Sequence, residues 1–482
     1  MSAVGFAQNV DDAMRYSQIF YGGTARFMSM GGAFTALGGD LSTLSQNPAG
    51  IGVFRSSEIS ISPQLYYIKS NTSFNGKSSD YLYDFNLSQA GFVGNILKND
   101  NESGLLTLNF GYSFNRTNNL NQAITMRGMT GTSSMADYWA DQANGLYKDE
   151  LGSNVPDAAL AYYTWIIDTL SGYDFDYGTV FSNYGDNPPS DYGQLTTRRL
   201  IDYKGYTAEH ALSLGGNISN KVFFGATVGI NTINFTSHYE HLESTEKTLP
   251  SGFMNFNYTY HFENTGTGIN MKMGAIIKPV DALRLGFAVH TPTYYRIKEY
   301  FFDDITSKFD DNNYEESNSA NRYKYALATP FRAMAGAALQ IKKFGLISVD
   351  YEFVDYGTAR FSETGDDYDY SEKNRMLKSS LGPVSNIRVG GELRLNKLYL
   401  RGGYGYYGSA YNEGDINEDL SYHSISGGFG FRERNINIDL GFTNLKNSQD
   451  YLLYQSAAGS PVAGLEIDRS IFTLTFGYKF GY

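Results

Sequence analysis

The chain has 482 residues, 38 lysines and arginines against 50 aspartates and glutamates, and no cysteine. Its net charge of −12 argues against nucleic acid as a partner, and the lack of cysteine excludes disulfides and thiolate metal sites. Glycine, tyrosine and phenylalanine occur 52, 40 and 32 times while charged residues make up 18%, which is typical of a β-rich membrane protein and not of a helical enzyme.

The first eight residues include Gly5, Phe6 and Ala7, a small-x-small pattern like that of a signal-peptidase site. Two interpretations stay open for residues 1–8. They are the residual tail of a signal peptide, or they are an ordinary disordered start.

Residues 9–56 do not show the pattern of a strand pair, because glycine and other small residues dominate them. A chain this compact and flexible is expected to fold into a barrel lumen as a plug. The alternative is an exported linker, which would leave its apolar residues exposed. We therefore predict a plug over 9–56, and we take Phe20, Phe27 and Phe34 as candidate ligand-binding residues.

From residue 57 onward, apolar and polar residues alternate with a period of two, most clearly in the last segment, where Phe472, Leu474 and Phe476 alternate with small or polar residues. An arginine at the bilayer midplane costs about 2–4 kcal/mol, so the charged parity must face the lumen. The expected strands are 57–69, 81–97, 103–116, 206–219, 221–241, 255–278, 281–302, 322–342, 344–362, 383–396, 397–411, 418–432, 435–452 and 466–482. These fourteen segments predict an all-β protein, a 14-stranded antiparallel transmembrane β-barrel over residues 57–482.

The connections between these strands alternate between short turns and long loops, as periplasmic turns and extracellular loops do in bacterial barrels. The longest connection, 117–205, has helix-compatible stretches and is predicted to be a partly helical extracellular loop. Two roles stay open for this loop. It offers an apolar capture surface, or it is a lid that packs on the barrel mouth.

The segment 22–36 and the residues Asn47, Pro48 and Ala49 resemble the hatch of the long-chain fatty acid transporter (FadL-like) family of outer-membrane proteins, and 329–332 resembles a strand-opening motif of that family. The resemblance implies a plug motif formed by Asn47, Pro48, Ala49 and Gly50. It also implies an apolar groove in the extracellular loops and a hydrophobic ligand that leaves sideways through the wall. The exit would lie at a kink in the third strand, where Gly104 and Gly111 are the candidates.

Two roles stay open for the charged residues that occupy the lumen-facing positions of the strands. They bond to one another and to the plug, or an arginine among them binds a ligand carboxylate. We take Arg388 and Arg394 as the candidates for ligand binding. The full set is Arg284, Asp350, Glu352, Arg388, Glu392, Arg394 and Arg401.

No motif in the sequence indicates catalysis. The six histidines lie outside any recognised catalytic context, so we expect no enzyme, no catalytic residue, no cofactor and no metal. A calcium site in the acidic loop at Asp366, Asp367 and Asp369 is the alternative, although a solvated acidic loop is commoner.

Taken together, the sequence predicts passive transport of hydrophobic or amphiphilic, fatty-acid-like small molecules in the outer membrane of a Gram-negative bacterium. The expected steps are loop capture, binding in the lumen, a shift of the plug and lateral exit. The alternative is a plugged barrel that serves as a binding or scaffold subunit of an outer-membrane export or assembly complex; a third interpretation is an open porin. The expected partners are outer-membrane lipid, a hydrophobic ligand, and outer-membrane proteins or lipoproteins.

Overall fold

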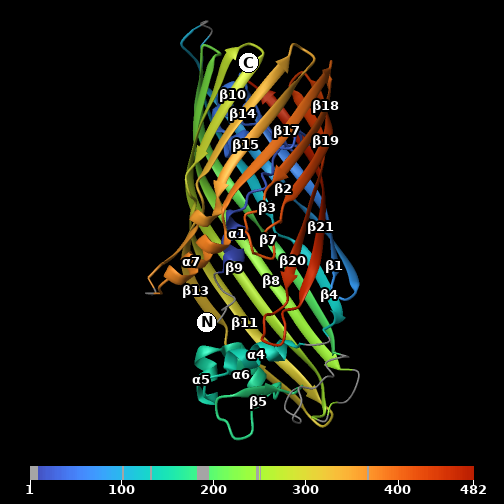
Figure 1. The fold of residues 1–482 in the computed structure, drawn as a ribbon. Helices are drawn as coiled ribbons and strands as arrows, with labels where there is room; N and C mark the ends of the chain where they lie inside the picture. Colours follow the sequence, from blue (N-terminus) through green and yellow to red (C-terminus); the bar gives the residue numbers. More distant parts are fainter. Residues whose placement is uncertain are drawn as a thin grey trace.

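The computed structural model describes residues 9–481 apart from 100–102, 131–132, 182–194, 246–248, 250 and 366–367. The two interpretations of residues 1–8 and the calcium alternative at Asp366 and Asp367 thus lie outside the described residues. The described chain forms one large antiparallel sheet that closes on itself, because β21 pairs with β1 from Phe480 opposite Ser57 to Gly464 opposite Ser73. Figure 1 shows the resulting barrel, with the short turns at the top and the extracellular end at the bottom.

Fourteen wall strands form the barrel, as predicted. Ten are continuous: β1 Ser57–Ser73, β2 Lys77–Lys98, β7 Leu195–Ile218, β8 Val222–Thr245, β9 Phe253–Val280, β17 Pro383–Leu395, β18 Leu398–Tyr407, β19 Tyr422–Glu433, β20 Ile436–Leu452 and β21 Val462–Phe480. Four are divided: β3 Leu105–Asn119 with β4 Gln122–Met129; β10 Leu283–His290 with β11 Tyr294–Phe309; β12 Asn313–Ser317 and β13 Asn321–Ala328 with β14 Arg332–Ile341; and β15 Gly345–Asp355 with β16 Arg360–Glu363.

The long connection is shorter than the predicted 117–205. Its first part forms β4 and its last part forms the start of β7, and these pair with each other from Gln122 opposite Tyr203 to Met129 opposite Thr196. The prediction missed these two strand segments because it depends on an apolar outer face. That face is needed only within the bilayer, and these strand segments lie outside it.

Three strands that were predicted to be continuous are interrupted. The breaks lie at 291–293, 329–331 and 356–359, on three neighbouring wall strands. Pro330 removes a ladder donor at the second break. Across the first two breaks, Thr293 and Thr329 hold the strands together: Thr329 donates its amide to the Thr293 carbonyl at 3.0 Å and Thr293 donates its amide to the Thr329 hydroxyl at 2.9 Å.

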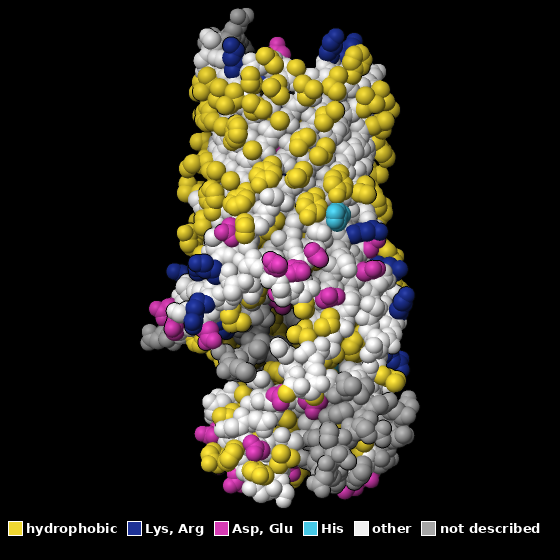
Figure 2. Space-filling model, viewed as in Figure 1, with side chains coloured by type: hydrophobic (Ala, Val, Ile, Leu, Met, Phe, Trp, Pro, Cys, Tyr) yellow, Lys and Arg dark blue, Asp and Glu magenta, His cyan; other side chains and the backbone are white. Residues whose placement is uncertain are grey.

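An apolar belt covers only part of the outer surface, in the upper half of Figure 2. On β8 the outward-facing residues are apolar up to Ile230 and polar from Thr232 to Glu240. On β20 the outward apolar residues end at Phe442. A closed barrel with such a belt is built to span a bilayer, and this places the protein in an outer membrane. The strands continue beyond the belt into the extracellular space.

The plug lies inside the barrel, as predicted. Its elements are α1 Val10–Ser17, α2 Ala25–Ser29, α3 Thr43–Gln46 and η1 Pro48–Val53, and β1 follows at Ser57. Phe27, Phe34 and Leu44 of the plug are fully buried. The alternative of an exposed exported linker is therefore wrong, because the apolar residues of this segment are covered by the barrel wall.

A ring of glycines lets the plug approach the wall. On ten wall strands, one lumen-facing glycine lies where an added Cβ would meet the plug. We call these residues the glycine ring: Gly111, Gly215, Gly225, Gly274, Gly286, Gly336, Gly390, Gly403, Gly428 and Gly441. Because most of these contacts are to plug backbone or short side chains, substitution leaves little freedom for adjustment.

The connection between β4 and β7 is partly helical, as predicted. It contains α4 Met135–Ala143, α5 Lys148–Asn154, α6 Pro156–Tyr163, β5 Ile167–Thr169 and β6 Tyr177–Thr179, and we call residues 133–181 the cap. The cap lies across the extracellular end (Figure 1). Between β15 and β17 the chain adds η2 Tyr356–Thr358 and α7 Ser371–Ser380. Among the described helices, none has the length and apolar character needed to cross a bilayer.

Candidate functional site: a cavity on the extracellular side of the plug

A cavity of about 650 Å³ lies in the lumen on the extracellular side of the plug. The plug supplies its floor through Phe20, Tyr21, Phe27 and Gly31, while the wall strands and the cap supply its sides. A volume of this size falls within the range of pockets that hold a drug-sized or acyl ligand, about 300–1,000 Å³. The lumen is therefore filled by the plug toward the periplasmic end and hollow on the extracellular side of the plug.

Aromatic and aliphatic side chains form most of the cavity wall. The ring of Phe20 lies 5.1 Å from that of Tyr407 and 4.9 Å from that of Tyr422, so it is held between β18 and β19. Leu445 and Ile467 line the cavity from β20 and β21. Such a wall favours an apolar ligand, because burial of apolar area yields about 25 cal/mol per Å².

Arg388 is the polar group at the floor. One Nη atom donates to Glu352 at 2.6 Å, whereas Nε and the second Nη atom make no hydrogen bond of ordinary geometry among the described residues, and the Tyr407 hydroxyl lies close to the guanidinium. The guanidinium lies 5.7 Å from the centre of the Tyr21 ring, and the Tyr21 hydroxyl is also buried without a partner. Glu352 is held in turn by Arg332 at 2.7 Å. A buried donor without an acceptor is costly, so this end of the cavity is prepared for a ligand oxygen.

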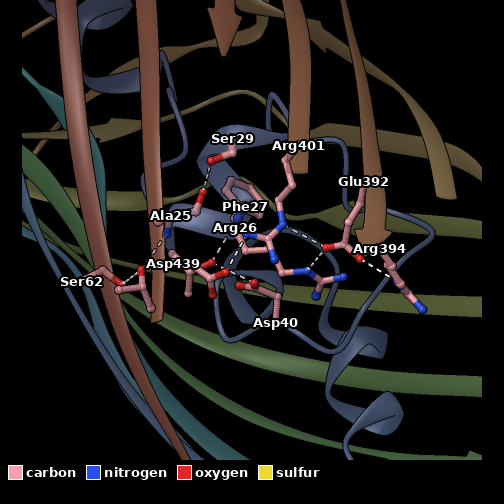
Figure 3. Close-up of polar contacts among 12 residues, drawn as sticks. Ala25, Arg26, Phe27, Ser29, Asp40, Ser62, Glu392, Arg394, Arg401 and Asp439 are labelled. Carbon is pink, nitrogen blue, oxygen red and sulfur yellow. Dashed lines mark hydrogen bonds and ion pairs between the residues drawn. The ribbon is translucent and has the colours of Figure 1, made fainter. Parts of the chain in front are cut away.

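A second charged network lies on the periplasmic side of the floor and fixes the plug (Figure 3). Glu392 accepts from Nε of Arg26 of the plug, Nε of Arg394 and Nε of Arg401, each at 3.0 Å. Arg401 also donates to Asp439 at 2.6 Å. In this network the lumen charges bond to one another and to the plug, the first of their two predicted roles.

The candidate ligand-binding residues therefore fall into two groups, those that line the cavity and those that do not. Phe20, Phe27 and Arg388 line the cavity, whereas Phe34 and Arg394 do not. The ring of Phe34 packs in the plug interior at 5.1 Å from that of Phe27, with the Arg26 guanidinium 5.2 Å from its centre.

The plug motif packs against the barrel wall on the periplasmic side of the cavity. Asn47 accepts from the Ala49 amide at 3.1 Å and donates to the Thr35 carbonyl at 2.6 Å, so it joins two turns of the plug. Pro48 begins η1, where a missing amide hydrogen costs nothing. Gly50 contacts Thr43 and Gly38 closely enough that a larger residue would displace them.

The third wall strand pairs continuously at Gly111, which lies opposite Val93 of β2 and Ser213 of β7. A Cβ at Gly111 would lie 3.0 Å from Leu44 and 3.1 Å from Ile51, so this position accommodates the plug. Gly104 precedes β3 with φ +83°. Register shifts lie close to it, between Asn95 and Leu97 and between Leu105 and Thr107.

The cap packs on the barrel with one face and exposes aromatic residues on another. The buried ring of Trp139 lies 5.3 Å from Phe256 and 5.5 Å from Tyr258. Glu243 of β8, fully buried, accepts from the Met135 amide at 3.0 Å and from the Ser134 hydroxyl. The inner face of the cap thus packs on the end of the barrel. On the outer face, Tyr147, Tyr163, Trp165, Tyr173 and Phe175 are exposed.

Proteins similar to this chain were found among solved structures and not by sequence. No protein-family model and no curated protein matches this sequence. A FadL homologue from Pseudomonas aeruginosa superposes with a TM-score of 0.58 at 12% identity, covering 96% of this chain and 100% of that one. The chain has the fold of the FadL-type barrels. The Pseudomonas putida toluene transporter TodX (TM-score 0.52, 12% identity, 96% and 99% covered) and the monoaromatic hydrocarbon channel CymD (0.50, 11%, 96% and 98%) share that fold.

Several cavity residues of this FadL-type barrel were not predicted. Tyr407 lies on the lumen parity of β18, and a parity rule applied to every strand would have found it. Tyr411 and Ile416 come from the connection between β18 and β19, and Arg15 comes from α1. No local pattern indicates such residues, because they are brought to the cavity by loop and plug conformation.

The cavity offers side chains that are suited to binding a small molecule. Among the residues described, no three histidine, aspartate or glutamate side chains converge as a metal ion would require. Arg388 offers donors and the aromatic wall offers apolar area, so the FadL-type cavity can hold a molecule with a long or flat apolar part and an oxygen at one end.

Proposed function

We propose that this protein carries hydrophobic or amphiphilic small molecules passively across the outer membrane. The cavity on the extracellular side of the plug is the binding site, with the apolar part of the ligand against Phe20 and Leu445 and a ligand oxygen at Arg388. The observation that carries the proposal is the pair of buried Arg388 donors without a hydrogen bond of ordinary geometry, at the end of a cavity lined mostly by aromatic and aliphatic side chains. The named neighbours with this fold carry hydrophobic molecules, and this supports the same class of cargo here.

The path beyond the cavity is part of the proposal. The plug shifts locally when ligand binds, and the ligand leaves sideways near the start of β3. The two register shifts beside Gly104 support this location, because irregular pairing weakens a wall locally. Complete departure of the plug from the barrel is disfavoured, since its contacts with the glycine ring and the Arg26–Glu392 pair hold it on many sides.

Ligand binding tests the proposal directly. Trp139 lies beside the cavity-lining residue Tyr138, and Trp165 is the only other tryptophan. In a Trp165→Phe background, energy transfer from Trp139 to dansyl-undecanoic acid reports ligand in the lumen of the barrel in nanodiscs. Arg388→Gln should weaken the affinity about tenfold or more, since a hydrogen bond to a charged group contributes about 1.5–3 kcal/mol.

The matched control is Arg394→Gln, which removes the same charge from a residue outside the cavity and should leave the affinity unchanged. Absence of saturable energy transfer in the parent protein would refute the proposed binding site. Equal affinities of the parent and Arg388→Gln would refute the role of Arg388.

A scaffold role is the second candidate, favoured by the exposed aromatic residues of the cap. Trp165 has φ +62°, a backbone conformation that costs energy for a bulky residue, and its side chain is 54% exposed. Exposed aromatic residues are typical of protein interfaces. Purification in mild detergent separates the two functions: stoichiometric protein partners favour the scaffold, and a solitary barrel with bound acyl chains favours transport.

A further inference from the structure

The barrel wall is incomplete next to the cavity, just beyond the apolar belt. Three neighbouring strands, β17, β18 and β19, stop before they reach the extracellular end. β18 and β19 stop at Tyr407 and Tyr422, which pair with each other. β17 begins only at Pro383, which pairs with Asp355 of β15. On one side of these three strands, β20 continues past Asn447, the partner of Tyr422, to Leu452. On the other side, β16 pairs with β13 and with no other strand of the described residues. We call the missing part of the wall, between β16 and β20, the window.

At each edge of the window, an asparagine side chain makes the backbone hydrogen bonds that a neighbouring strand would otherwise make. Asn417 donates its amide nitrogen to the Asp450 carbonyl at 3.0 Å and accepts from the Asp450 amide at 2.8 Å. Asn374 of α7 makes the same pair of bonds with Phe361 of β16, at 2.9 Å to the carbonyl and 2.8 Å from the amide. These bonds satisfy exposed strand edges without extending the sheet, so no strand formed by the described residues fills the window.

A connecting segment, residues 408–421, crosses the window, and we call it the strap. It is tied to the chain after α7, where Gly382 donates its amide to the Ala410 carbonyl at 2.9 Å. At its other end Asn417 holds β20. Tyr411, Ile416 and Leu420 of the strap line the cavity. The strap therefore frames an opening into the cavity.

The surface beside the strap is hollowed. Figure 2 shows a recess below the apolar belt, with several acidic side chains in the polar band that separates the belt from the recess. Asp11, Asp415 and Asp450 line the cavity at this side, and the strap carries further carboxylates at Glu413, Glu418 and Asp419. Ile416, half exposed, lies among these acidic residues. The opening thus presents an apolar contact inside a negatively charged rim.

The alternative access route, along the barrel axis, is covered by the cap. Trp139 is fully buried between the cap and β9. The Ser307 hydroxyl of β11 donates to the Thr164 carbonyl at 2.6 Å, and the Ala457 amide donates to Asp141 at 2.6 Å. These bonds tie the described part of the cap to opposite sides of the barrel end. A ligand on the axis would have to break them.

We propose that hydrophobic ligands reach the cavity sideways through the window, from the outer boundary of the membrane, and not along the axis through the cap. Apolar molecules gather at the membrane surface, and the window opens next to that surface. The carboxylate rim repels anionic lipid head groups, so membrane lipid is kept out while neutral or tail-first molecules pass. This inference rests on the proposed function, since it assigns the access route to the same cavity.

The lack of native cysteine allows each route to be blocked selectively. Glu413→Cys places a single thiol on the strap, and Asp149→Cys places one on the outer face of the cap; both replace an exposed carboxylate that lies outside the cavity lining. Each variant is labelled with polyethylene glycol through a reducible disulfide. Association of dansyl-undecanol, the neutral analogue of the acid, is then followed by energy transfer from Trp139 in nanodiscs.

The label on the strap should slow association about tenfold, and reduction should restore the rate, because access and not folding is affected. The label on the cap should leave the rate unchanged within about twofold. Slow association with the cap label alone would place access on the axis and overturn the proposal, as would equal rates for both labelled variants. Failure of the unlabelled parent to bind would instead refute the proposed binding site.

Discussion

The side-chain oxygen of Asn47 occupies the space that a side chain at position 274 would need. Gly274 lies on β9, and an added Cβ would overlap that oxygen. Asn47 uses the same oxygen to accept from the Ala49 amide and its nitrogen to reach the Thr35 carbonyl. The plug and the wall are therefore fitted at the level of single atoms, and the glycine ring extends this fit around the lumen.

Gly274→Ala should destabilise the barrel by about 1–3 kcal/mol, the usual cost of overpacking, because Asn47 cannot move without losing its bonds within the plug. The measurement is the urea midpoint of unfolding. Gly402→Ala is the matched control, since its Cβ would lie 3.9 Å from the nearest atom, the Ser426 carbonyl oxygen. Equal midpoints for the two variants would show that the plug adapts freely to the wall.

Arg26→Met should loosen the plug from the wall. Arg26 is almost buried and its bond to Glu392 is charged, so its loss should cost about 1.5–3 kcal/mol of local stability. Hydrogen exchange at α2 should become faster, and conductance in planar bilayers should rise. Lys397→Met removes an exposed pair with Glu433 and should change neither measurement. An unchanged exchange rate at α2 in Arg26→Met would contradict the assigned role.

Asn417→Ala should free the edge of β20. The Asp450 amide would lose its acceptor, and its hydrogen exchange should become about five- to tenfold faster, since one hydrogen bond contributes about 1 kcal/mol. The amide of Lys446, which faces His423 of β19 on the same side of β20, serves as the internal control in the same spectrum. If the two amides respond equally, Asn417 acts on the whole strand and not on its free edge.

The carboxylates of the strap should select against anionic ligands. In the triple variant Glu413→Gln, Glu418→Gln and Asp419→Asn, association of dansyl-undecanoate should become about two- to fivefold faster at low salt, while that of dansyl-undecanol should not change. The difference should disappear near 0.5 M salt, where the Debye length is only about 4 Å. An equal increase for both ligands would mean that the strap acts through its conformation and not through its charge.

The cap should be more stable in mild acid. Burial raises the pKa of Asp157 in α6 from 3.8 to about 6, and the nearby Asp303 carboxylate adds to this effect. The folded cap therefore binds a proton that the unfolded cap releases, so its stability is complete below pH 4 and falls as the pH rises to about 6.

Hydrogen exchange at α6 should thus be slower at pH 4.5 than at pH 7.5, after correction for the intrinsic rates. Asp157→Asn should reduce this difference, since the amide does not titrate. A pH dependence that Asp157→Asn leaves intact would assign the effect to another group of the cap.

The sequence predicted the strands best where the bilayer restricts the outward face. In β8 and β20 each outward residue of the membrane region must be apolar and the lumen side need not be, so the period of two is strong. Beyond the bilayer both faces are free to be polar. There the prediction missed β4 and the start of β7, and it continued strands through breaks such as 329–331.

For the site, the sequence predicted which residues face the lumen but not which of them meet. Arg388 and Arg394 share a parity, and only one lines the cavity, because the plug crosses the lumen between them. Phe20 lies in the cavity and Phe34 in the plug interior for the same reason. The path of the plug depends on many weak contacts distant in sequence, and no local pattern encodes it.

By itself the sequence determined that the chain is a fourteen-stranded membrane barrel with a plug, because alternation against lipid and the content of small residues are local properties of the chain. The tertiary structure alone decided where the cavity lies, that two buried donors of Arg388 make no hydrogen bond of ordinary geometry among the described residues, and that the wall stops short between β16 and β20. These features arise from contacts between segments hundreds of residues apart, and such contacts form only when the barrel closes around the plug.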